Sequence, residues 1–97
     1  MNNFEFQGNV KETFQTEKVG EFNKRIVTVT AEETKGEKTF THTLAFEAWN
    51  DKTTLLDNLE ANQKVNIFFN IKSNEWTNSS GIKTYFTSLT IWKIEKL

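Results

Sequence analysis

A repeated alternation of apolar and polar residues most constrains how this chain can fold. Phe4, Phe6, Gly8 and Val10 alternate with polar residues, which is the period of a half-buried β-strand. Similar stretches recur along the chain, and β-branched residues are frequent in several of them. We expect strands at about residues 3–15, 23–31, 39–49, 65–75 and 83–95. The chain is therefore predicted to be all-β.

The alternation also predicts which side chains face the core. The inward positions expected in the last three strands are Phe40, His42, Leu44, Phe46, Ala48, Val65, Ile67, Phe69, Ile71, Leu89 and Ile91. His42 falls in this set, which favours a structural histidine with satisfied partners over a catalytic one. Phe68 has the outward parity of its strand.

Residues 50–60 change the period and predict a short helix. Asn50 or Asp51 can cap its first turn, and Leu55, Leu56 and Leu59 form an apolar stripe. Three strands, a helix and two more strands is the element order of the OB-fold. We expect one domain over residues 1–97, a five-stranded OB-fold β-barrel with one short helix between strands three and four.

Composition narrows the range of functions. The chain has 97 residues, no Cys and one His, so we expect no metal site and no cofactor. No catalytic constellation is recognisable, and we do not expect an enzyme. Met1–Phe6 lacks the pattern of a secretory signal, and no apolar run is long enough to span a bilayer, so a cytoplasmic location is expected.

The formal charge is −1, which disfavours binding of nucleic acid by charge alone. Residues 62–97 nevertheless carry five lysines against two glutamates. A locally basic face on a nearly neutral body is therefore expected.

Two segments resemble the family of bacterial single-stranded-DNA-binding (SSB) proteins. They are Glu75-Trp76-Thr77-Asn78-Ser79-Ser80-Gly81, followed by Tyr85, and Leu44-Ala45-Phe46-Glu47-Ala48-Trp49-Asn50. The chain is also similar to a shorter group of uncharacterised OB-fold proteins, in Trp49-Asn50-Asp51-Lys52 and Ile91-Trp92-Lys93-Ile94-Glu95. The similarity covers roughly residues 4–95. It departs from the SSB family at Thr43, Thr34 and Lys35, where that family has aromatic residues.

The resemblance implies a surface on which aromatic rings stack with bases. Trp76 is the first candidate, although it could instead brace the hairpin by packing on Tyr85. Trp49 could stack with a base or cap the barrel beside the helix. Tyr85 could stack with a base and donate to a phosphate. Phe22 could clamp a base or plug the barrel end.

Polar residues flank these rings. Lys24, Arg25, Lys72 and Lys83 could neutralise phosphates, although each could equally be a solvated charge. Asn74 could hydrogen-bond a base or a sugar.

The expected function is sequence-tolerant binding of single-stranded DNA in replication, recombination or repair, by a homo-oligomer (a dimer or tetramer). RNA is a less favoured ligand, because outward positions on the second and third strands are mostly Thr. The alternative is a protein–protein interaction module, a dimeric accessory subunit of a replication or phage assembly. In that case Phe68, Trp92 and Trp49 would be buried between chains.

Overall fold

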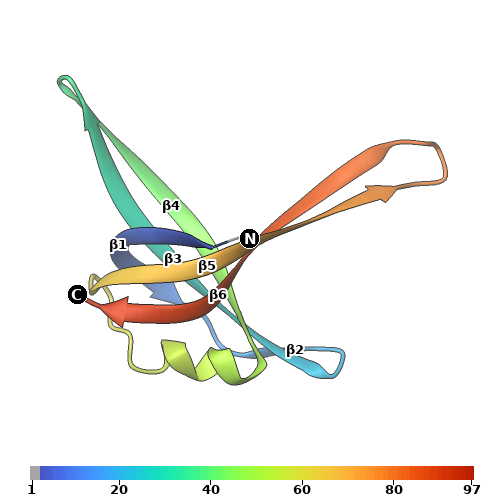
Figure 1. Cartoon of the computed structure of the whole chain (residues 1–97), viewed down its shortest axis with the longest axis horizontal. Helices are drawn as coiled ribbons and strands as arrows, with labels where there is room; N and C mark the ends of the chain where they lie inside the picture. Colours follow the sequence, from blue (N-terminus) through green and yellow to red (C-terminus); the bar gives the residue numbers. More distant parts are fainter. Residues whose placement is uncertain (1–2) are drawn as a thin grey trace.

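Five long strands form the body of the protein in the computed structural model, which describes residues 3–97 (Figure 1). They are β1 (Phe4–Thr13), β3 (Phe22–Lys35), β4 (Lys38–Trp49), β5 (Lys64–Thr77) and β6 (Lys83–Lys96). The short β2 (Glu17–Val19) pairs with β3, and the 3₁₀ helix η1 (Asn50–Leu56) connects β4 to β5. The expectation of a cytoplasmic location used the segment Met1–Phe6. Its first two residues, Met1 and Asn2, lie outside the described residues. Between residues 3 and 97, no helix is long and apolar enough to cross a membrane.

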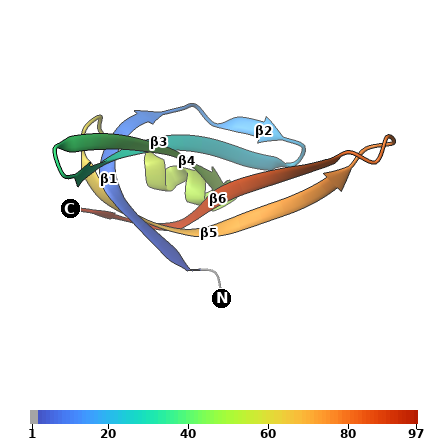
Figure 2. The same cartoon turned by 90° about the horizontal axis from the view of Figure 1, so that it is seen from above.

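The sheet closes into a barrel in the order β1-β5-β6-β4-β3, because β1 pairs with both β5 and β3 (Figure 2). The pairings are antiparallel except that of β4 with β6, which meet in parallel at Glu47 and Thr90. Closure removes most of the free sheet edge. The predicted five-stranded all-β barrel, with a short helix before its fourth long strand, is confirmed.

A β-bulge at Lys11 bends β1, so that this strand pairs with both β5 and β3. Phe4–Asn9 pair with β5, whereas Asn9 and Val10 before the bulge and Glu12 and Thr13 after it pair with β3. Gly8 lies just ahead of this bend, and a Cβ there would come 2.5 Å from the carbonyl oxygen of Thr30. Close approach of two backbones therefore requires glycine at this position.

Gly8→Ala is expected to destabilise the barrel by about 1–3 kcal/mol, because the backbone of β3 has to move to admit the methyl group. Urea unfolding followed by circular dichroism measures the loss. Gln7→Ala, at the exposed neighbouring position, is the control and should unfold close to wild type. Equal midpoints for the two variants would contradict the close approach.

The core consists of inward side chains from every long strand and from η1. Its buried apolar members are Val10, Val27, Val29, Phe46, Ala48, Leu56, Val65, Ile67, Phe69 and Ile91. Leu44, Ile71 and Leu89 pack against this cluster, as do Leu55 and Leu59 of the predicted helical stripe. The inward parity predicted for these strands is confirmed within the barrel.

The predicted cap of the helix is wrong. Trp49 occupies the N-cap position, and its side chain makes no capping hydrogen bond. Asn50 adopts a positive φ of 54°, and its Oδ1 accepts a hydrogen bond from the backbone N–H of Asn23 at 3.2 Å. Asn50 therefore ties the start of β3 to the end of β4.

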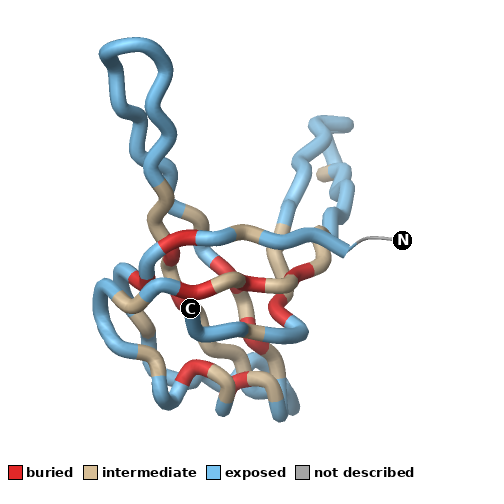
Figure 3. The backbone as a smooth tube through the Cα atoms, turned by 60° about the vertical axis from the view of Figure 1, so that its left-hand side comes forward, coloured by how far each residue is buried: buried red, intermediate tan, exposed pale blue. Residues whose placement is uncertain are grey.

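Two hairpins, β3–β4 and β5–β6, extend beyond the barrel as exposed ribbons (Figure 3). They account for a radius of gyration of 15.4 Å, against about 13 Å for a compact domain of ~100 residues. Phe40 and His42 lie on the first ribbon and are exposed, so their predicted core positions are wrong. The ribbon projects beyond the barrel at this point, and no strand within residues 3–97 packs over these two side chains. His42 Nε2 instead lies 3.0 Å from Glu33 Oε2.

Candidate nucleic-acid interface

A hollow of about 240 Å³ opens on the outer surface between β4 and the β5–β6 hairpin. We call it the aromatic groove, and its lining residues are Glu47, Trp49, Lys72, Asn74, Phe86, Ser88 and Thr90. All have the outward parity of their strands. Strand register brings them together, since Lys72 lies opposite Ser88 and Asn74 lies opposite Phe86.

Trp49 is held in a fixed orientation at the edge of this groove. Its Nε1–H donates to Glu47 Oε1 at 3.0 Å, and Lys24 Nζ lies 5.6 Å from the ring centroid. Lys24 Nζ is in turn 3.6 Å from Glu47 Oε2. A half-buried indole with two such partners has little freedom to rotate, and a rigid ring is suited to stacking because less entropy is lost on binding.

Trp76 extends the same outward face along the hairpin. It lies two residues beyond Asn74 on β5, pairs with Thr84 and is 60% exposed. Between residues 3 and 97, no aromatic partner is found for its ring. An exposed indole of this kind is free to stack with a ligand.

Tyr85 is also exposed, but it lies on the other face of the hairpin. It is opposite Glu75 in the register, and neighbouring residues on a strand point to opposite sides. The hypothesis that Tyr85 packs on Trp76 across the turn is therefore wrong. The two rings cannot form a single platform on one face.

The four predicted phosphate-binding cations occupy different environments. Lys72 lines the aromatic groove, and Lys24 lies beside it, next to the ring of Trp49. Lys83 is on the Tyr85 face, 3.4 Å from Glu75. Arg25 points toward η1, with its side chain 17% exposed and paired with Asp57. Its Nε donates to the carbonyl of Phe14 at 2.7 Å. The guanidinium thus joins β3 to the segments that follow β1 and η1, and it is not displayed for a phosphate.

A second, more apolar hollow continues this surface on the far side of Lys24. It measures about 280 Å³ and is lined by Phe14, Gln15, Glu17, Lys24, Ile26, Thr28 and Ala45. Phe22, at the β2–β3 turn, shares the parity of Lys24 and is exposed. The β2–β3 turn and the β5–β6 hairpin extend to the same side of the barrel (Figure 1).

Sequence reasoning missed Phe14 and Phe86. Phe86 could have been predicted to face outward. Leu89 and Ile91 of the same strand point inward, and the alternation places Phe86 on the opposite face. Phe14 follows the end of β1. Its exposure depends on the turn between β1 and β2, which no local pattern specifies.

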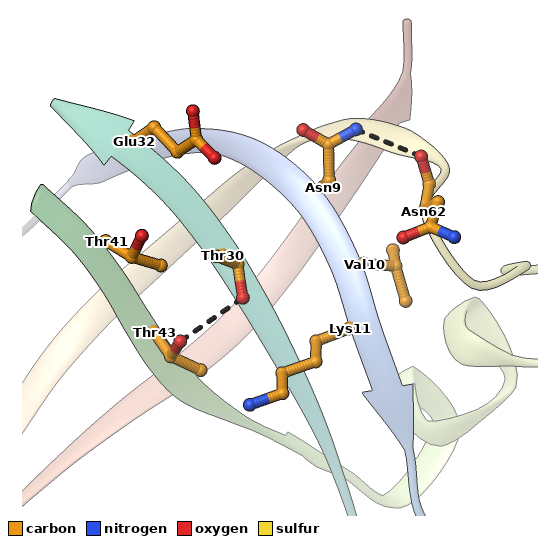
Figure 4. A pocket seen from close by; sticks show the side chains of 8 residues that line it. All are labelled: Asn9, Val10, Lys11, Thr30, Glu32, Thr41, Thr43 and Asn62. Atoms are coloured by element: carbon orange, nitrogen blue, oxygen red, sulfur yellow. Dashed lines mark hydrogen bonds between the residues drawn. The ribbon is translucent and has the colours of Figure 1, made fainter. Parts of the chain in front are cut away.

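A third hollow, of about 590 Å³, has a different lining (Figure 4). Its side chains are Asn9, Val10, Lys11, Thr30, Glu32, Thr41, Thr43 and Asn62. The hydroxyls of Thr30 and Thr43 are 3.2 Å apart, and Asn9 Nδ2 donates to the carbonyl of Asn62 at 3.0 Å. Without an aromatic ring among these residues, the hollow offers no base-stacking surface.

Comparison with known proteins assigns the chain to a family. Residues 5–95 match the family described as "Domain of unknown function (DUF3127)". The chain belongs to the DUF3127 family. No curated protein matches this DUF3127 domain significantly.

Among solved structures, the DUF3127 domain is similar to the "Plasmodium falciparum SSB complex with ssDNA". The TM-score is 0.74 at 14% sequence identity, over 100% of this chain and 95% of the other. At that identity the likeness shows the fold alone. It agrees with the closed barrel described above, and the predicted OB-fold is confirmed.

Proposed function

We propose that this DUF3127 domain binds single-stranded DNA with little sequence preference, as SSB proteins do, in replication, recombination or repair. Bases would stack on Trp49 and Trp76, with Phe86 between them and Phe22 at the far end of the surface. Lys24 and Lys72 would lie near the phosphates, and Asn74 would contact a base or a sugar. The role is one of binding rather than catalysis.

One observation carries this proposal: a fixed indole and an exposed indole share one outward face with two lysines. Trp49 is held by Glu47 and Lys24, and Trp76 has no aromatic partner among residues 3–97. Aromatic platforms beside cations along an OB barrel are the arrangement that single-strand binding requires. The structural neighbour, an SSB complex with ssDNA, gives further support.

The test is a titration with a 20-nucleotide single-stranded DNA, followed by quenching of tryptophan fluorescence at low salt. We expect saturable quenching at micromolar protein, and much weaker quenching by a duplex of the same sequence, whose bases cannot reach the rings. No quenching at low salt, or equal affinity for the duplex, would contradict the proposal.

Lys72→Gln is expected to reduce the salt dependence of binding. Each lost phosphate contact on a single strand makes the negative slope of log K against log salt concentration shallower by about 0.7. Lys83→Gln is the matched control, because Lys83 lies on the opposite face beside Glu75, and its slope should equal that of wild type. Affinities at four salt concentrations give both slopes, and an unchanged slope for Lys72→Gln would remove this lysine from the site.

Subunit association is a second candidate, favoured by a separate patch. Phe68 and Trp92 pack together with ring centroids 5.4 Å apart, and Trp92 is 39% exposed. An exposed indole on a half-buried phenyl ring is suited to contact with a second copy, as a homo-oligomer requires. Under the first candidate Trp76→Ala weakens strand binding and leaves assembly unchanged. Under the second, Trp92→Ala disrupts assembly, because it removes the exposed ring of the patch.

A further inference from the structure

A carboxylate lies in the aromatic groove, although the proposed ligand is a polyanion. The Glu47 side chain is 19% exposed and lines the groove beside Trp49 and Thr90. A phosphate placed over Glu47 would be repelled by it. The groove therefore favours a neutral base at this point, with the phosphates displaced toward Lys24 and Lys72.

The hydrogen-bonding capacity of Glu47 is only partly used. Oε1 accepts from Trp49 Nε1 at 3.0 Å, and Oε2 lies 3.6 Å from Lys24 Nζ. An ionised carboxylate has about four acceptor positions, so acceptor capacity remains.

Acceptors at this point favour bases that present amino groups. The 4-amino group of cytosine and the 6-amino group of adenine are donors, whereas thymine has a carbonyl oxygen at the corresponding position. A carboxylate can only accept, so thymine would leave two acceptors facing each other. We propose that Glu47 makes this one position of the groove select amino-bearing bases, with cytosine preferred over thymine, while the stacking rings beside it accept any base. This inference rests on the proposed binding of single-stranded DNA.

The test compares dC and dT oligomers of equal length at pH 8, where cytosine is unprotonated. We expect dC to bind at least about fivefold more tightly, since hydrogen bonds to a charged group discriminate strongly. Oligomers of 5-methyl-dC and dU separate the amino group from the thymine methyl group. The methylated cytosine should bind like dC, and dU should bind like dT.

Glu47→Gln is the decisive variant. Its carbonyl oxygen can still accept from Trp49, while its amide can donate to the thymine carbonyl, so the ratio of dC to dT affinity should fall toward one. Glu95→Gln is the matched control, because Glu95 pairs with Lys93 outside the groove, and it should keep the wild-type ratio.

The outcomes separate the two proposals. Equal binding of dC and dT by wild type, or tighter binding of dT, overturns the selection and leaves strand binding standing. If Glu47→Gln keeps the wild-type ratio of dC affinity to dT affinity, Glu47 does not select the base. If no oligomer binds, both proposals fail.

Discussion

Replacing Trp49 and Trp76 together with alanine is expected to lower the affinity for single-stranded DNA by about 2–5 kcal/mol, since stacking contributes roughly 1–3 kcal/mol per base. Each single variant should lose about tenfold in affinity, on the order of 1.4 kcal/mol. Fluorescence anisotropy of a labelled oligomer measures the loss, because it does not depend on the removed indoles. Circular dichroism confirms that the barrel remains folded.

Tyr85→Ala is the matched comparison for this experiment. Tyr85 is exposed on the same hairpin as Trp76, but on its opposite face. We expect its affinity to stay within about twofold of wild type, since a ring off the groove face contributes no stacking there. A loss from Tyr85→Ala that equals the loss from Trp76→Ala would show that the strand does not follow one face.

Phe46→Ala is expected to have the largest effect on stability. Phe46 is fully buried, with its ring centroid 5.0 Å from that of Phe69 and 5.8 Å from that of Phe6. Removing such a ring costs about 3–5 kcal/mol, a large part of the ~5–15 kcal/mol that stabilises a domain. Thermal unfolding should show a Tm lower by about 12 °C or more.

Phe40→Ala is the control for Phe46→Ala. Phe40 is on the same strand with the same parity, but it lies on the projecting hairpin and is 44% exposed. The free energy of unfolding should change by less than about 1 kcal/mol. A large loss at Phe40, or a small one at Phe46, would contradict the division between barrel and hairpin.

Phe46 and Phe40 also show how much of the fold can be predicted from the sequence. Alternation correctly identified the inward faces of the strands inside the barrel, because parity is a local property of an extended chain. It could not show where a strand leaves the barrel, since burial depends on the strand that lies across from it. Phe40 and His42 were therefore assigned to the core together with Phe46.

The candidate site was only partly predictable for a related reason. The aromatic and basic residues were identified by type, but their faces follow from strand parity. Arg25 has the parity of the buried Val27 and points to η1, and Tyr85 has the parity of Leu89. The pairing of β4 with β6, which places Glu47 beside Thr90, is a contact between distant segments that no local pattern indicates.

The most direct test of the proposed interface uses the three indole N–H signals in a two-dimensional ¹H–¹⁵N NMR spectrum, one for each tryptophan. During titration with a dC oligomer, the signals of Trp49 and Trp76 are expected to shift with a common saturation point. The signal of Trp92, which packs against Phe68 and does not line the groove, should shift much less. If Trp92 shifts while the other two do not, or if none shifts, strand binding in the aromatic groove is contradicted.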